Sequence, residues 1–98
     1  MVDFKILNLG FFKLRSFRIL IKLVKAYMLI SCEIGEEQSI YSKLKEIPEI
    51  KNCLITYGSY DIVAEFETET SHDMNDVISS KIRKLENIRS TITLRVSD

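Results

Sequence analysis

The stretch Tyr57-Gly58-Ser59-Tyr60-Asp61-Ile62-Val63 places a glycine turn between two apolar runs near the middle of the chain. Two related sequences flank this turn. The first is Leu44-Lys45-Glu46-Ile47 followed by Ile50-Lys51-Asn52, and the second is Ile82-Arg83-Lys84-Leu85 followed by Ile88-Arg89-Ser90. The two copies are 38 residues apart (85 minus 47, 88 minus 50). This repetition predicts a duplicated unit hinged at Gly58.

The composition is that of an ordinary globular domain, with 46% apolar and 29% charged residues in a chain of 98. A domain of this size buries only about 65% of the surface that its unfolded chain exposes, so oligomerisation would add burial. Formal neutrality hides an uneven distribution, because residues 1–25 carry a net charge of +5 (six basic, one acidic) and the remainder sums to −5. An acidic main body argues against direct nucleic-acid binding, since phosphate recognition requires clustered Lys and Arg.

Residues 1–25 form a basic N-terminal extension, and we expect the working domain to span residues 26–98. The longest uncharged run of the extension, residues 6–12, is far shorter than the roughly 20 residues of a membrane-spanning helix. Basic residues also interrupt any apolar centre of a signal peptide. Three interpretations remain open: an upstream extension from a start codon assigned too early, a basic amphipathic helix on a membrane surface, and a segment packed on the domain or a neighbouring subunit.

Residues suited to metal, nucleotide or nucleophilic chemistry are isolated from one another. Cys32 and Cys53 lie inside apolar runs and lack metal or redox spacing, so we interpret both as reduced packing residues. His72 is the only histidine and has no potential ligands at a metal spacing. The glycines are also isolated, which argues against a nucleotide-binding loop. We therefore expect no metal, no cofactor and no catalytic residues.

Hydrophobic periodicity from Ala26 onward predicts the order βαββαβ. Residues 27–34, 50–57, 60–67 and 88–96 have the pattern of strands, and the second and third form a hairpin around Gly58. Two apolar stripes indicate helices. The first consists of Ile40, Leu44 and Ile47, and Pro48 ends this helix. The second follows a cap at Thr70 or Ser71 and consists of Met74, Val77, Ile78, Ile82 and Leu85. The order predicts an α+β, ferredoxin-like fold, with a four-stranded antiparallel sheet and both helices on one face.

One face of this sheet is predicted to be open. The helix-side residues should be Met28, Ile30, Ile62, Ala64, Phe66, Ile92 and Leu94. The open face should have an apolar centre of Leu29, Cys53, Ile55, Tyr57 and Val63, with a rim of Glu33, Glu65, Glu67, Thr91, Thr93 and Arg95. An apolar centre inside a charged rim predicts a dimer formed through this face. The register of residues 50–57 stays open, because Leu54 and Ile55 are both apolar and a shift of one residue would exchange the faces.

Three segments together resemble a known family. Gly58-Ser59-Tyr60-Asp61-Ile62-Val63, residues 44–50 and residues 88–94 are similar to the regulatory domain of the Lrp/AsnC transcription regulators, called the RAM domain. The resemblance covers residues 24–98, and the DNA-binding helix-turn-helix of the full-length family is absent. It implies a stand-alone RAM protein of prokaryotes, which retains effector binding and assembly in the cytoplasm without direct operator recognition.

In that family, dimers associate into rings or octamers, and amino-acid effectors bind where dimers meet. Carried over by position, the resemblance implies an effector site made of Gly58, Tyr60, Asp61, Thr91 and Thr93. Asp61 can accept hydrogen bonds from an effector's ammonium group, while backbone N–H groups near the glycine and threonine hydroxyls can donate to its carboxylate. The implied partners are further copies of the chain, an amino acid or related small molecule, and full-length Lrp/AsnC regulators.

A structural explanation stands beside each of these roles. Gly58 suits a hairpin without any ligand, Asp61 can satisfy free N–H groups of the hairpin, and Thr91 and Thr93 suit any strand. The leading hypothesis is an effector-binding, oligomer-forming regulatory domain. Two alternatives remain: a purely structural oligomerisation partner of full-length regulators, and a small dimeric monooxygenase-type enzyme on the open sheet face. The enzyme would require a buried His or Asn in a closed cavity, and the predicted strands contain no histidine.

Overall fold

A computed structural model of the chain describes residues 22–97. The elements in chain order are β1 (Val24–Cys32), α2 (Glu37–Lys45), β2 (Ile50–Ile55), β3 (Ile62–Thr68), α3 (Ser71–Val77), the π-helical turn η1 (Ile78–Ile82) and β4 (Ile88–Arg95). This is the predicted order βαββαβ, with the second helix continued by η1. Most of the predicted N-terminal extension lies outside the described residues.

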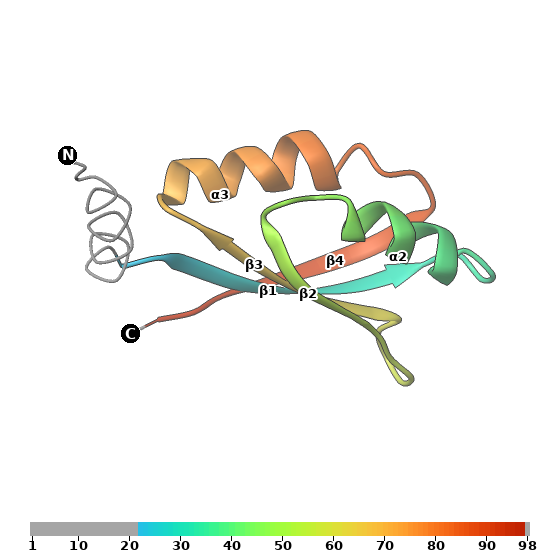
Figure 1. The fold of residues 1–98 in the computed structure, drawn as a ribbon. Helices are drawn as coiled ribbons and strands as arrows, with labels where there is room; N and C mark the ends of the chain where they lie inside the picture. The colour runs from blue at the N-terminus through green and yellow to red at the C-terminus, as the bar shows by residue number, and fades with distance from the viewer. Residues whose placement is uncertain (1–21, 98) are drawn as a thin grey trace, which may run out of the picture.

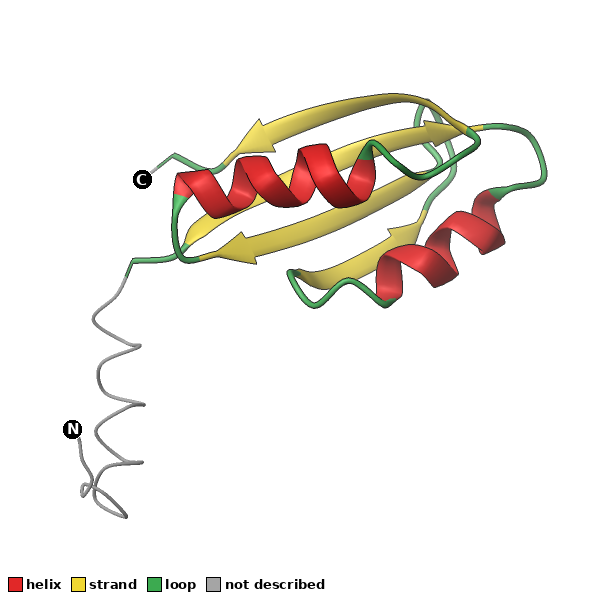
Figure 2. Ribbon diagram, turned by 90° about the horizontal axis from the view of Figure 1, so that it is seen from above, coloured by secondary structure: helices red, strands yellow, loops and turns green. Residues whose placement is uncertain are grey.

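The strands form one antiparallel sheet in the order β2-β3-β1-β4, so β2 and β4 are its edges. Both helices lie on the same face of this sheet, and within residues 22–97 no helix covers the other face (Figure 1). Seen from above the helix layer, α2 runs alongside β2, and α3 lies over the middle of the sheet (Figure 2). The predicted ferredoxin-like α+β fold is confirmed.

The core lies between the helices and the two central strands. Alternate residues of β1 and β3 are completely buried, and they are Ala26, Met28, Ile30, Ile62, Ala64 and Phe66. The helical segments add Ile40, Leu44, Met74, Val77 and Ile82. Each large apolar side chain buried in this way contributes about 1.5–3 kcal/mol relative to an exposed one. The predicted helix-side residues of the central strands are confirmed.

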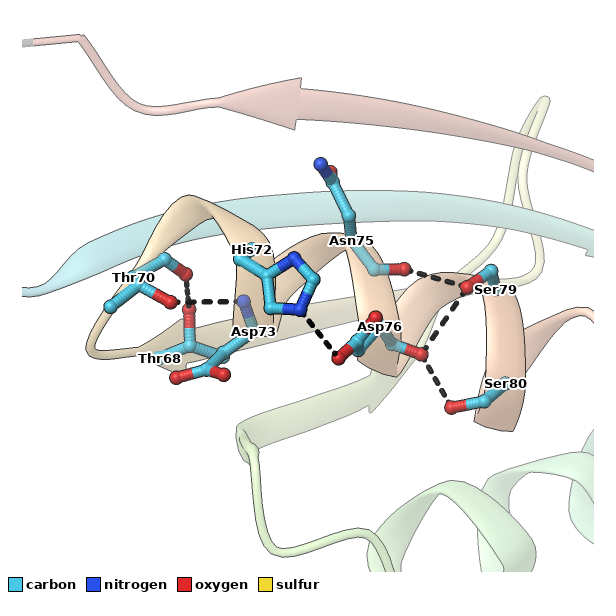
Figure 3. Close-up of polar contacts among 8 residues, drawn as sticks. All are labelled: Thr68, Thr70, His72, Asp73, Asn75, Asp76, Ser79 and Ser80. Carbon is cyan, nitrogen blue, oxygen red and sulfur yellow. Dashed lines mark hydrogen bonds and ion pairs between the residues drawn. The ribbon is translucent and has the colours of Figure 1, made fainter.

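Threonine residues fix the turn between β3 and α3. Thr70 is the N-cap of α3, because its Oγ1 accepts a hydrogen bond from the backbone N–H of Asp73 at 3.0 Å (Figure 3). The buried Thr68 donates a hydrogen bond from its Oγ1 to the carbonyl of Thr70 at 2.8 Å. Of the two predicted caps, Thr70 and Ser71, the structure selects Thr70.

The edge strand β2 contains a bulge at Lys51. Ile50 pairs with Phe66 and Asn52 pairs with Glu65, so the sheet register passes over Lys51. An extra residue of this kind reverses the alternation of side chains for the remainder of its strand.

The other edge strand, β4, contains an equivalent bulge at Arg89. Ile88 pairs with Cys32 and Ser90 pairs with Ser31, so Arg89 has no partner in the register. The two bulges lie at the same position of the internal repeat, where an isoleucine is followed by a basic residue and a small polar one.

The bulge in β2 corrects the predicted faces of that strand. Cys53 pairs with Ala64 and Ile55 pairs with Ile62, and residues directly opposite each other share a face. Both therefore lie on the helix side, and the prediction that Cys53 and Ile55 belong to the open face is wrong. Leu54 takes that place, with 53% of its surface exposed.

The bulge in β4 corrects the predicted faces of the last strand. Thr91 pairs with Ile30 and Thr93 with Met28, which puts both threonines on the helix side. Arg95 lies on this side too, because its Nη2 donates a hydrogen bond to Oδ1 of Asn75 in α3 at 2.6 Å. The open face instead carries the apolar residues predicted to be buried in this strand, Ile92 and Leu94.

Candidate functional site

The loop between β2 and β3 projects from the sheet on the side away from the helices (Figure 1). The N–H of Thr56 donates to the carbonyl of Asp61, and its Oγ1 donates to the carbonyl of Tyr60, both at 2.8 Å. Gly58 has a φ of +121°, which L side chains rarely adopt. A Cβ at Gly58 would meet no atom within 4 Å, so the backbone conformation, rather than close packing within the chain, accounts for the glycine.

Asp61 fastens this loop to the end of β1. The last pair between β1 and β3 is Ile30 with Ile62, and the N–H of Asp61 donates to the carbonyl of Ile30 at 2.8 Å. Two residues further along β1, the N–H of Cys32 donates to Oδ2 of Asp61 at 2.9 Å. The carboxylate thus replaces a main-chain acceptor where the ladder stops. Asp61 therefore has the structural role of satisfying a free N–H, and that N–H belongs to β1 rather than to the hairpin.

The thiol of Cys32 lies beside the Asp61 carboxylate. Burial, followed by the negative charges of Asp61 and Glu37, raises the pKa of this thiol from 9.0 to about 11. Burial also raises the pKa of the Cys53 thiol, which Lys45 partly opposes. Both cysteines are free and buried, in agreement with their predicted packing role. Neither has the lowered pKa of a reactive thiol.

The residues of the implied effector site do not converge within one chain. Gly58, Tyr60 and Asp61 belong to the loop that precedes β3, whereas Thr91 and Thr93 lie on β4. The order β2-β3-β1-β4 places the whole of β1 between these two groups. A ligand that contacts both groups would have to span the width of β1 or lie between subunits.

The open face is more apolar than the sequence predicted. Leu29 and Val63, which pair with each other across the central strands, lie on it as expected. It also carries four large, exposed apolar side chains, and they are Tyr27, Leu54, Ile92 and Leu94, with exposed fractions of 39%, 53%, 42% and 51%. Tyr57 is fully exposed in the projecting loop beyond the end of β2. The sequence analysis assigned Ile92 and Leu94 to the wrong face because it did not anticipate the bulge in β4. It left the register of Leu54 open and did not include Tyr27 in the apolar centre.

A hollow of about 400 Å³ lies between the α3–η1 segment and the chain that enters β2. Its lining includes Glu49, Asp73, Asp76 and Lys81, and none of the predicted effector or interface residues. Nζ of Lys81 lies 3.0 Å from Oε1 of Glu49, and this contact lowers the pKa of the Glu49 carboxyl. The ion pair links η1 to the residue before β2, and this structural role accounts for the contact without a ligand.

His72 lies on α3, outside the sheet, with 84% of its side chain exposed. Its Nε2 is 3.4 Å from Oδ2 of Asp76, one turn further along the helix (Figure 3). Within residues 22–97, no group of three or more His, Cys, Asp or Glu side chains is placed to hold a metal ion. The helices of this part of the chain are also too short and too polar to cross a membrane.

The chain matches the family model of the Lrp/AsnC ligand-binding domain over residues 25–98. It belongs to this family. The HTH-type transcriptional regulator FL11 of Pyrococcus furiosus is 30% identical over 73 residues, a match that covers 74% of this chain and 48% of FL11. The chain thus spans about half the length of this relative, which is named as a transcription regulator. The resemblance inferred from the sequence is confirmed.

Two solved structures have the same fold. The crystal structure of FFRP-DM1 is 35% identical with a TM-score of 0.73, and the match covers 76% of this chain and 99% of that one. The regulator NMB0573 of Neisseria meningitidis, described in complex with L-Met, matches with a TM-score of 0.71 over 85% of this chain and 55% of its own. At 10% identity, this second likeness shows the fold alone.

Proposed function

We propose that this Lrp/AsnC ligand-binding domain binds amino acids or related small molecules at contacts between its subunits and thereby modulates transcription regulators. The family assignment makes it a regulatory domain. The identity of the effector, the place where it binds and the response of the assembly are the proposed part. We assign it no catalytic step and place its action in the cytoplasm.

The observation that carries the proposal is the set of free backbone donors in the projecting loop. Within residues 22–97, the N–H groups of Tyr57, Gly58, Ser59 and Tyr60 donate no hydrogen bond to another protein group. Consecutive free N–H groups around a residue with positive φ form a concavity that suits an anion. The α-carboxylate of an amino acid is such an anion.

Asp61 can supply the complementary charge. Its Oδ2 accepts a hydrogen bond from the N–H of Cys32, and the Cys32 thiol also interacts with the carboxylate, whose two oxygens together have about four acceptor sites. An ammonium group that approaches Oδ1 would form a charge-assisted hydrogen bond. The hydroxyls of Thr91 and Thr93 would then come from a neighbouring subunit, since β1 separates them from this loop within one chain.

The open face supplies a reason for subunits to associate. Its apolar side chains belong to all four strands and form a surface that two copies can bury against each other across a twofold axis. An effector that bridges two such dimers would stabilise the larger assembly by mass action. NMB0573, which shares the fold, is described with bound L-Met, and this supports amino acids as the first effectors to test.

Calorimetric titration with the standard amino acids, followed by light scattering, tests the sensing role. We expect heat of binding and a change of mass with at least one of them. Asp61→Asn is the informative variant, because its amide oxygen can still accept from Cys32 while the negative charge is lost. It should weaken effector binding with little effect on folding, and the absence of heat and mass change with every amino acid would refute sensing.

The purely structural alternative has an observation in its favour. One carboxylate oxygen of Asp61 already has a structural partner, the N–H of Cys32. A protein that only assembles with full-length regulators needs the open face and no effector. It predicts that Asp61→Asn leaves both assembly and partner binding unchanged, whereas Leu54→Asp abolishes them.

A further inference from the structure

The hollow between the α3–η1 segment and the chain that enters β2 is predominantly acidic. Four carboxylates and one ammonium group line it, and they belong to Glu49, Glu69, Asp73, Asp76 and Lys81. Lys81 is paired with Glu49 at 3.0 Å, so three carboxylates carry the charge in excess (four minus one). These three side chains are exposed, and Figure 3 shows two of them, Asp73 and Asp76, on α3. We call this feature the acidic hollow.

The N-terminal segment, residues 1–21, has the opposite charge. It contains four basic residues and one acidic residue, which gives a net charge of +3 (four minus one). The basic residues are Lys5, Lys13, Arg15 and Arg18, and the acidic one is Asp3. Because the whole chain is formally neutral, residues 22–98 sum to −3. The acidic hollow therefore brings together an excess of negative charge equal to the excess of positive charge in the segment.

The N-terminal segment joins the domain beside the acidic hollow. Val24, the first residue of β1, pairs in the register with Thr68, and both Thr68 and Glu69 line the hollow. Lys22 and Ser71, the first residue of α3, line one smaller hollow together, so the chain enters β1 next to the start of this helix. Adjacent strands lie about 5 Å apart, whereas 21 residues span about 30 Å as a helix and about 70 Å when extended. The segment is long enough to reach the acidic hollow in either conformation.

We propose that residues 1–21 dock in the acidic hollow of their own chain, with basic side chains against Glu69, Asp73 and Asp76. Of the three interpretations of the N-terminal extension, this one selects packing on the domain. The direct connection through Lys22 gives the segment a high effective concentration at its own hollow. A second copy of the chain has to supply the same contacts from solution, and docking within one chain is therefore favoured.

The response to salt distinguishes this contact from apolar packing. Pairs between exposed side chains are individually weak, and dissolved ions screen them. The three carboxylates lie around one hollow, so several weak pairs form together when the segment docks. The Debye length falls to about 3 Å at 1 M salt, and docking by charge should be lost there. Contacts between apolar side chains are not screened in this way.

Limited proteolysis of the full 98-residue chain with trypsin measures the docking. Trypsin cleaves after lysine and arginine, and cleavage within residues 1–21 requires the segment to leave the hollow. Glu69→Gln combined with Asp76→Asn removes two carboxylates from the lining. At about 0.05 M salt, this variant should be cleaved within residues 1–21 at least about threefold faster than the wild type. Unchanged cleavage within residues 22–97 would show that the domain itself is still folded.

Glu46→Gln combined with Glu86→Gln is the matched control. Both carboxyl groups are exposed, neither lines the acidic hollow, and the net charge changes by the same amount. The control should be cleaved as slowly as the wild type at low salt. At about 1 M salt, the wild type and both variants should be cleaved at one rate. Equal rates for the wild type and the hollow variant at low salt would overturn the proposal.

Cross-linking with a carbodiimide identifies the surface that the segment contacts, because this reagent joins an ammonium group to a neighbouring carboxylate. The expected link runs from Lys13 or Lys5 to one of the three exposed carboxylates of the acidic hollow. A mixture of isotope-labelled and unlabelled chains shows whether a link lies within one chain. Links to carboxylates of the open sheet face, links only between chains, or no link to the hollow would each overturn the proposal. Effector binding at the loop between β2 and β3 is independent of all these results.

Discussion

Lys51 and Arg89 occupy equivalent positions of the internal repeat, 38 residues apart (89 minus 51), and each is passed over by the register of its edge strand. Both lie immediately after an isoleucine that packs against the core, and both have exposed side chains. A bulge in an edge strand increases its twist and hinders pairing with strands of other molecules. In this protein it also decides which residues reach the open face.

The bulge at Lys51 predicts opposite results for two adjacent substitutions. Cys53→Asp places a charge in the core and should destabilise the fold by about 3 kcal/mol or more. Leu54→Asp places the same charge on the open face and should change the stability of the isolated subunit by less than about 1 kcal/mol. Urea denaturation at low protein concentration measures both, and equal losses would contradict the assigned register.

The sequence predicted the central half of the fold well and the edges poorly. β1 and β3 alternate without interruption, so Met28 and Phe66 could be assigned to the core from periodicity alone. Periodicity cannot assign a face when a strand contains an extra residue, because every side chain after it is reversed. The repeated isoleucine and basic residue were visible in the sequence, but nothing local distinguishes a bulge from a regular strand there.

The candidate site could be proposed from the sequence as a list of residues, whose effector role stays a prediction, but not as a geometry. The glycine turn indicated the loop at Gly58, and its positive φ agrees with that reading. The bond between the Asp61 carboxylate and the Cys32 N–H joins residues 29 positions apart and depends on where the ladder ends. The separation of Thr91 from the loop follows from the strand order, which becomes evident only once the sheet is assembled.

The contact between Asp61 and Cys32 predicts a difference between two variants of Asp61. Asp61→Ala leaves the partly buried N–H of Cys32 without an acceptor and should reduce the free energy of unfolding by about 1–3 kcal/mol. Asp61→Asn retains an acceptor oxygen and should recover most of this loss. Thermal unfolding of both variants provides the comparison, and equal stabilities would show that the bond contributes little.

The cap of α3 predicts a difference between two neighbouring hydroxyl residues. Thr70→Ala removes the acceptor for the Asp73 N–H and should destabilise the protein by about 1 kcal/mol. Ser71→Ala removes an exposed hydroxyl that makes no capping bond and should have little effect. Chemical denaturation measures both changes. A larger loss of stability for the Ser71 variant would show that Ser71, rather than Thr70, is the N-cap.

The raised pKa of the Cys32 thiol predicts a loss of stability in alkaline solution. The pKa is about 11 in the folded protein, against an ordinary value of 9.0, because burial and the nearby carboxylates disfavour the thiolate. The folded state therefore holds this proton more tightly than the unfolded state does. The resulting stabilisation is complete below the ordinary value and disappears as the pH rises through the raised one.

Urea denaturation of the wild type and of Cys32→Ala, at a series of pH values from about 8 to about 10.5, isolates this effect. Other groups that titrate in this range are common to both proteins, so they cancel when the two curves are subtracted. The stability of the wild type should fall more steeply than that of the variant above the ordinary pKa of 9.0. Parallel curves would mean that water reaches the thiol freely, which would also remove the case for Cys32 as a buried packing residue beside Asp61.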